Sequence, residues 1–188
     1  MPETTDEIGY TLSIRPDPAI WLVGPLAHET ATEWIETTLE AVAEDFGVAA
    51  GSAESTYLHS VLTSFATAEL GSPFRLLRLR ALADAPLVAR LDVLAAGAAD
   101  PLAEFGHGFA WYDHGPRTEV VEGDPSIRRA TRLYVDDGVR AVVRLHRRLA
   151  DDGPSLLLAC AGFTLAATAS GLDDLIHLTQ CIEIKEMT

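Results

Sequence analysis

The sequence contains few cysteines and no long hydrophobic run. Only Cys160 and Cys181 occur among 188 residues. Their separation matches neither a zinc motif nor a disulfide framework, so we expect free thiols and no metal site. No stretch approaches the roughly 18 uninterrupted apolar residues of a transmembrane helix. With 48% hydrophobic residues, the composition predicts a globular protein that makes no contact with a membrane.

Basic residues are also scarce. Lysine and arginine total 14 against 28 aspartates and glutamates, so the net charge is −14. Phosphate binding requires a basic field, and this balance argues against nucleic acid as a partner. Residues 1–70 carry twelve acids and one base, whereas residues 71–149 carry twelve bases and ten acids. Segment 1–7 lacks a signal-peptide pattern, and we expect a cytoplasmic protein; thirteen arginines against one lysine indicate a GC-rich bacterial genome.

The familiar catalytic motifs are missing. There is no G-x-S-x-G elbow, no P-loop, no G-x-G-x-x-G and no H-E-x-x-H. Adjacent aspartates at 136–137, 151–152 and 173–174 fit turns and a helix start, which explains them without catalysis. A catalytic triad is recognised by its geometry and not by sequence order, so an enzymatic function stays open as an interpretation. The sequence favours a protein that is not an enzyme and that has no cofactor.

The segment 127–163 carries the strongest structural signal. Asp-Asp-Gly occurs in it at 136–138 and 151–153, between β-prone runs, and Asp-Gly favours two-residue hairpin turns. Counting outward from such turns predicts three antiparallel strands, with His146 facing Arg129 on one side and Ala159 on the other. The run 155–163 is apolar on both faces, so this strand should lie inside the sheet with cover on both sides.

The same count gathers basic residues at one end of the first two strands: Arg128, Arg129, Arg144, His146, Arg147 and Arg148. It also places Arg128 opposite Arg147, and like charges in that position destabilise a strand pair. Acidic groups should therefore lie nearby. Two interpretations stay open: a layer of internal ion pairs or a solvated edge, or an anion-binding site formed by Arg129, Arg144, His146 and Arg148.

The first helix has a clear start and an unusual surface. Thr30-Ala-Thr-Glu33 is a capping box, and Gly47 is a natural residue to follow the helix. The polar face carries acidic residues at spacings of three and four, without an intervening base: Glu29, Glu33, Glu36, Glu40 and Glu44. Like charges at this spacing cost roughly 0.2–0.5 kcal/mol each. This acidic stripe is either a solvated face or the contact for a basic surface.

Other patterns place the remaining elements. They predict a strand at 10–14, a strand or a core-tethered loop at 19–23, a helix at 55–70, a hairpin of 74–82 with 87–94, a strand at 117–122, and a closing helix capped at Ser170. The irregular segment 95–116 holds two histidines and three other chemically distinctive side chains, His107, Trp111, Tyr112, Asp113 and His114. Long loops are often functional, although aromatic residues that plug the edge of a core explain this composition as well.

The predicted fold is a single α+β domain over residues 1–188, with a mostly antiparallel sheet of six or seven strands and helices on both faces. This order of elements, with a short N-terminal strand before a capped helix and a closing helix, resembles the Mog1/PsbP-like fold, including the bacterial LpqN-type proteins. The resemblance extends over most of the chain. It implies binding of other proteins rather than catalysis. LpqN-type proteins are typically exported lipoproteins, a location that differs from the one expected here.

Two functions remain under consideration. The first is a non-enzymatic protein-binding module (an adaptor, a chaperone-like, assembly, immunity or inhibitor component) whose acidic stripe contacts a basic protein partner. The second is a small anionic-ligand binder or enzyme that uses loop 104–117 and the cluster around Arg144 and His146. Exposed sheet edges would also allow a homodimer.

Overall fold

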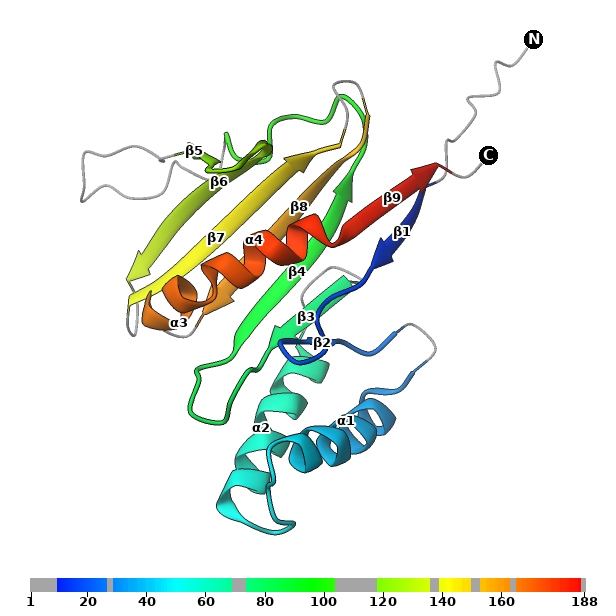
Figure 1. The fold of residues 1–188 in the computed structure, drawn as a ribbon, viewed down its shortest axis with the longest axis vertical. Helices are drawn as coiled ribbons and strands as arrows, with labels where there is room; N and C mark the ends of the chain where they lie inside the picture. Colours follow the sequence, from blue (N-terminus) through cyan, green and yellow to red (C-terminus); the bar gives the residue numbers. More distant parts are fainter. Residues whose placement is uncertain are drawn as a thin grey trace.

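A seven-stranded antiparallel sheet forms the centre of the protein (Figure 1). The computed structural model describes residues 10–26, 29–68, 74–103, 118–135, 139–149, 153–162 and 165–186. The strand order is β2-β3-β4-β8-β7-β6-β5. These strands are β2 (Trp21–Val23), β3 (Phe74–Arg78), β4 (Leu87–Leu94), β5 (Thr118–Val121), β6 (Asp124–Val135), β7 (Val139–Arg148) and β8 (Ser155–Gly162).

Four helices and a small second sheet complete the described fold. The helices are α1 (Ala31–Asp45), α2 (Ala53–Thr67), α3 (Leu165–Ser170) and α4 (Leu172–Gln180). Strands β1 (Tyr10–Ile14) and β9 (Ile182–Glu186) pair antiparallel in a sheet of their own. They bring the two ends of the described chain side by side (Figure 1). The predicted α+β class, with seven strands in the main sheet, is confirmed.

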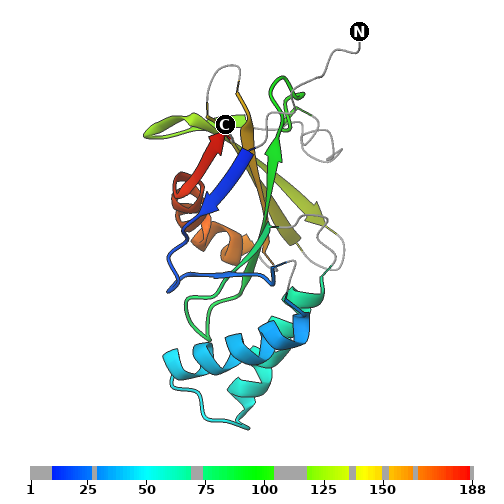
Figure 2. The same ribbon diagram turned by 90° about the vertical axis from the view of Figure 1, so that its right-hand side faces the viewer.

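Helices cover the two faces of the sheet at different places (Figure 2). On the α3/α4 face the largest core cluster joins the sheet to α4, and it includes Leu76, Leu87, Leu91, Leu145, Leu156, Leu158, Leu175 and Leu178. On the other face α1 and α2 pack against β3 through Leu77. The Trp34 and Phe65 rings of these helices lie 5.5 Å apart, centroid to centroid. Each fully buried leucine stabilises the fold by about 1.5–3 kcal/mol.

The start and end of α1 follow the predicted local rules. The Thr30 hydroxyl accepts a hydrogen bond from the Glu33 amide at 3.2 Å, and the Glu33 carboxylate accepts one from the Thr30 amide at 3.2 Å. Gly47 follows the helix with a φ of 64°, a conformation that glycine adopts without steric cost. The capping box is therefore confirmed.

Strand β8 is covered fully on one face and only in part on the other, where Leu157 is buried and Ala161 is exposed. Leu156, Leu158 and Cys160 enter the core on the α3/α4 face. Leu157 points to the other face and packs against Leu102. Because Leu102 belongs to segment 95–103, a loop rather than a helix covers this part of the second face.

The predicted hairpin registers are wrong. Val135 pairs with Val139, which leaves three residues between β6 and β7 instead of two. Arg128 therefore lies opposite His146, and Arg147 lies opposite Ile127, so the expected Arg128–Arg147 pair does not form. Between β7 and β8 the register moves by two residues, and His146 pairs with Leu157. A shift of one residue exchanges the two faces of a strand, whereas a shift of two preserves them. The turn residues 136–138, 151 and 152 lie outside the described part.

The expected cap at Ser170 is also wrong. Two helices follow β8, and the residue that precedes α4 is Gly171, without a side-chain cap. The Ser170 hydroxyl instead donates to the Ala167 carbonyl at 3.0 Å. A Cβ atom on Gly171 would lie 2.0 Å from Leu87 Cδ1. A side chain at position 171 would therefore force the buried side chain of Leu87 on β4 to move. None of the described helices is long and apolar enough to cross a membrane.

Candidate functional site

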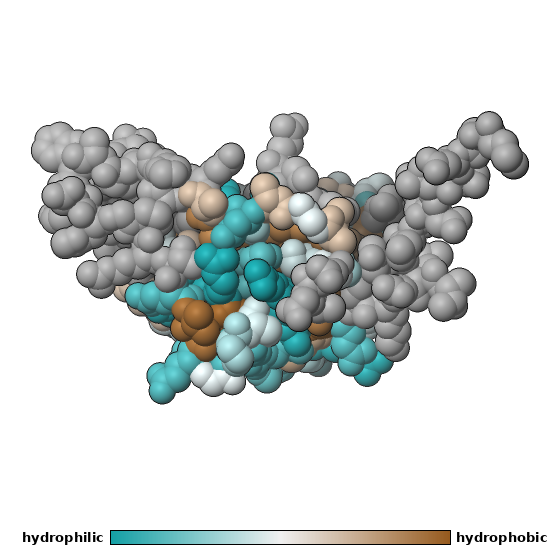
Figure 3. Space-filling model, turned by 90° about the horizontal axis from the view of Figure 1, so that it is seen from above, coloured by the Kyte–Doolittle hydropathy of each residue, from teal (hydrophilic) through white to brown (hydrophobic). Residues whose placement is uncertain are grey.

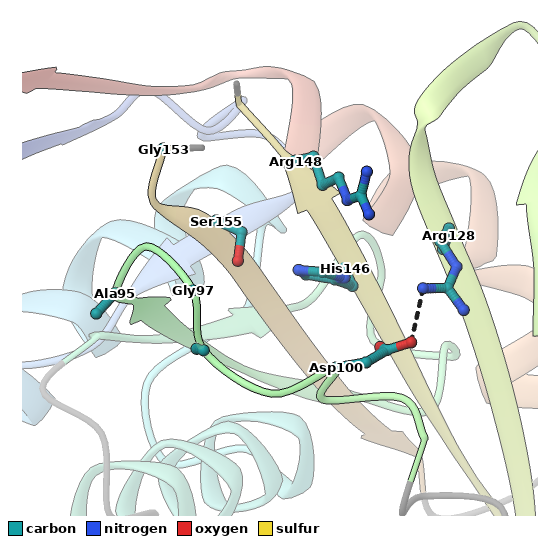
Figure 4. A pocket seen from close by; sticks show the side chains of 9 residues that line it. Ala95, Gly97, Asp100, Arg128, His146, Arg148, Gly153 and Ser155 are labelled. Atoms are coloured by element: carbon teal, nitrogen blue, oxygen red, sulfur yellow. Dashed lines mark hydrogen bonds and ion pairs between the residues drawn. The ribbon is translucent and has the colours of Figure 1, made fainter. Parts of the chain in front are cut away.

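A pocket of about 180 Å³ lies on the same face of the sheet as α1 and α2, outside the area that these helices cover. Segment 95–103 folds over β8 and β7 there, held by the buried Leu102. The pocket is lined by Ala95, Gly97, Ala98, Asp100, Arg128, His146, Arg148, Gly153 and Ser155. Figure 4 shows the His146 ring between Ser155 on one side and Asp100 with Arg128 on the other.

The alternation of β7 explains why polar groups meet at this place. Val143 and Leu145 enter the core on the α3/α4 face, so Arg144, His146 and Arg148 point to the opposite face. Pairing of β6 with β7 adds Arg128, which lies directly opposite His146. On the other side of β7, Ser155 lies opposite Arg148. Three neighbouring strands thus supply four polar side chains to one pocket.

The loop contributes one carboxylate to this positive surface. Arg128 Nη1 donates to Asp100 Oδ2 at 2.8 Å. Burial acts to raise the pKa of Asp100, but the hydrogen bonds from Arg128 and from the Leu102 amide, together with the charge of Arg128, outweigh it and lower that pKa. Asp100 therefore stays ionised and neutralises one arginine. Arg148 is exposed and forms no ion pair with any described residue.

His146 is the least satisfied side chain of the pocket. It is only 7% exposed, and within the described part of the chain neither ring nitrogen has a hydrogen-bond partner. Burial lowers the pKa of His146, the charges of Arg128 and Arg148 lower it further, and Asp100 opposes them. The ring is consequently neutral near pH 7. A buried polar group without a partner costs about 1–3 kcal/mol, so a ligand that reaches this ring would relieve a cost that is already present.

The structure separates the four residues of the expected anion site. His146 and Arg148 line the pocket. Arg144 lies on the same face, where its Nη1 donates to the Pro101 carbonyl at 3.3 Å and holds the loop. Arg129 lies on the opposite face and pairs with Glu119. Arg128 takes the place expected for Arg129 because of the register shift. Counting outward from three residues between the strands, at 136–138, would have placed Arg128 opposite His146. The sequence holds no signal that Asp100 or Ser155 belongs to the site.

The acidic stripe lies on the exposed side of α1 and just before it. All five glutamates are exposed. The Glu29 carboxylate accepts a hydrogen bond from the Leu26 amide at 2.9 Å. The cap hydrogen bonds from Thr30 lower the pKa of Glu33. No ion pair among the described residues involves Glu36, Glu40 or Glu44, so these three exposed charges have no counter-charge within that part of the chain.

Other candidate chemistry is limited. Burial raises the pKa of the Cys160 thiol to about 12, and a thiol in that state is a poor nucleophile and a poor metal ligand. Over the described ranges, no three histidine, cysteine, aspartate or glutamate side chains cluster closely enough to hold a metal ion. The segment 104–117, with His107, Trp111, Tyr112, Asp113 and His114, lies outside the described residues. Figure 3, which views the molecule from above, shows hydrophobic residues of the described part as separate spots among hydrophilic ones.

Comparison with known proteins gives a weak structural likeness and shows no family. No family model and no curated protein matches the sequence. The chain is similar in structure to LpqN, described as involved in cell envelope biogenesis of Mycobacterium tuberculosis. That match covers 98% of this chain and 87% of that chain, at 12% identity and a TM-score of 0.43. At these values the likeness shows neither a family nor a function.

Proposed function

We propose that this protein is a non-enzymatic binding module whose acidic stripe contacts a basic surface on a protein partner. The observation that carries the proposal is the exposure of Glu36, Glu40 and Glu44 without a counter-charge in the described structure. The stripe follows α1, which lies at one end of the molecule (Figures 1 and 2), and its glutamates are on the exposed side of that helix. A partner can therefore reach it without disturbing the core.

The setting of the stripe supports a protein surface as the partner. Leu26, which is 44% exposed, lies beside Glu29, so an apolar side chain adjoins the acidic row. Protein interfaces combine apolar contacts with a polar rim. Complementary charge also accelerates association and excludes partners of the wrong sign. A basic protein surface matches both features.

The test is affinity capture from native lysate with the tagged protein and with the Glu36→Lys, Glu40→Lys double variant. We expect one stoichiometric partner that is released by salt, and its loss from the double variant, because the reversed charges repel a basic surface. The melting temperature should not fall, since the substitutions relieve like-charge contacts along α1. The readout is the amount of partner that co-elutes, identified by mass spectrometry.

A matched control separates the stripe from net charge. Glu54 and Glu122 are exposed and lie outside the stripe, so Glu54→Lys with Glu122→Lys changes the total charge by the same amount. This control should retain the partner. Equal capture by the stripe variant and the wild type would refute the assignment of the contact to α1.

A further inference from the structure

We propose that the pocket between segment 95–103 and strands β6–β8 binds a small oxyanion, the phosphate or carboxylate group of a metabolite, through Arg128, His146 and Arg148. This site is separate from the acidic stripe and does not depend on the proposed protein partner. The sequence suggested an anion site that contains His146 and Arg148, whereas Arg128 and Ser155 join these residues only when β6, β7 and β8 are paired in their actual register.

The charge of the pocket favours an anion. Two arginines face a single carboxylate, Asp100, although the whole protein carries a net charge of −14. Arg128 uses Nη1 for its ion pair with Asp100, and a guanidinium has five N–H groups to offer. Arg148 has no ion pair within the described residues. Guanidinium groups bind carboxylate and phosphate oxygens with two parallel hydrogen bonds.

His146 supplies the second, independent observation. Its ring is 7% exposed, lines the pocket, and has two nitrogens without a partner in the described structure. A ring nitrogen that carries a proton would donate to an oxyanion, and the ligand would satisfy a group that the fold leaves unsatisfied. Ser155 adds a hydroxyl beside the ring, and Figure 4 shows both side chains pointing into the same space.

The size of the pocket limits the ligand. Its volume of about 180 Å³ is below the roughly 300–1,000 Å³ of pockets that enclose drug-sized molecules. A nucleotide does not fit inside, whereas a single phosphate or carboxylate group does. Any larger part of the ligand would extend beyond the residues that line the pocket.

Binding of an anion should also couple to protonation of His146. The groups that face this ring are Asp100 from the loop, Arg128 from β6, and Arg144 and Arg148 from β7. A bound dianion adds negative charge beside the His146 ring and stabilises the protonated form of that ring. Affinity for an anion whose own charge is constant should therefore increase as the pH falls.

The experiment is calorimetric titration of the full chain with sulfate, which remains a dianion between about pH 5 and 8, at constant ionic strength maintained with chloride. A second arm uses malonate, and a third uses inorganic phosphate, to distinguish carboxylate from phosphate ligands. We expect saturable binding by at least one probe. Arg148→Ala should weaken it about tenfold or more, because a hydrogen-bonded charge is removed.

Two further variants make the result decisive. Arg15 is exposed and lies outside the pocket, so Arg15→Ala removes the same charge and should leave the affinity within about twofold of wild type. His146→Gln should abolish the rise in sulfate affinity between pH 8 and pH 5.5. The proposal is overturned if none of the probes binds saturably, or if Arg15→Ala and Arg148→Ala weaken binding equally.

Discussion

At the scale of single residues, His146 has the most distinctive energetics. The folded protein holds its ring neutral by burial and by neighbouring arginines, which lower its pKa. The unfolded chain takes up a proton near pH 6.5. Above that pH both states are neutral, and below it the unfolded state binds more protons. The free energy of unfolding should therefore decrease as pH falls through about 6.5.

The variant His146→Phe removes this dependence. At pH 8 we expect its free energy of unfolding to equal that of wild type or to exceed it by about 1 kcal/mol, because an unsatisfied polar ring is replaced by an apolar one. At pH 5.5 its advantage should be larger. Urea denaturation at both pH values measures the difference, and His59→Phe, on the exposed surface of α2, is the control. An equal advantage at both pH values would contradict the neutral, buried ring.

At the scale of elements, one buried ion pair joins β3 to α4. Arg78 Nε donates to Asp174 Oδ2 at 2.6 Å, and the two side chains are 3% and 15% exposed. Asp174→Ala would leave the Arg78 guanidinium buried without its carboxylate, and loss of one partner of a buried pair costs about 3–5 kcal/mol. We expect a decrease of that size in the free energy of unfolding, measured by urea denaturation.

Two companion variants identify the cause. The exposed neighbour Asp173 lies in the same helical turn, and Asp173→Ala should cost less than about 1 kcal/mol, the value of a charge near a helix N-terminus. Replacing the pair by Arg78→Met with Asp174→Leu should recover most of the loss, since apolar residues of similar volume substitute well for buried ion pairs. If Asp173→Ala and Asp174→Ala were equally destabilising, the buried pair would not be the reason.

Local rules predicted some elements of this fold correctly. The Thr30–Glu33 capping box and the glycine at position 47 are each local signals. Each depends on residues within about one helical turn, so a stretch of four or five residues determines it. Strand β7 was predictable because alternation has a strict period of two. The Ser170 cap failed because Ser170 is the last residue of α3, so Gly171 precedes α4.

The candidate pocket depends on information that a local pattern does not contain. Asp-Gly favours a two-residue turn but also fits a longer one, and the length of the turn decides whether Arg128 or Arg129 faces His146. Asp100 reaches Arg128 across 28 positions of sequence, through a loop without regular structure. The acidic stripe, in contrast, was predictable residue by residue because helical spacing places Glu33, Glu36, Glu40 and Glu44 on one face.

At the scale of the whole molecule, electrostatic repulsion opposes the folded state. Acids outnumber bases two to one, and a large net charge destabilises a compact chain. Exposed or half-exposed ion pairs such as Arg128–Asp100 contribute only about 0–1 kcal/mol each. Salt therefore weakens the attraction within these pairs less than it weakens the repulsion among the excess carboxylates. Raising NaCl from about 10 mM to 150 mM shortens the screening length from about 30 Å to 8 Å.

We therefore expect the free energy of unfolding to increase over this range of salt. Urea denaturation is the suitable measurement, because urea carries no charge and does not screen. The Glu36→Lys, Glu40→Lys variant carries a net charge of −10 instead of −14, so its increase with salt should be smaller than that of wild type. A decrease in wild-type stability with salt would show that attraction, rather than repulsion, dominates the charges of the folded protein.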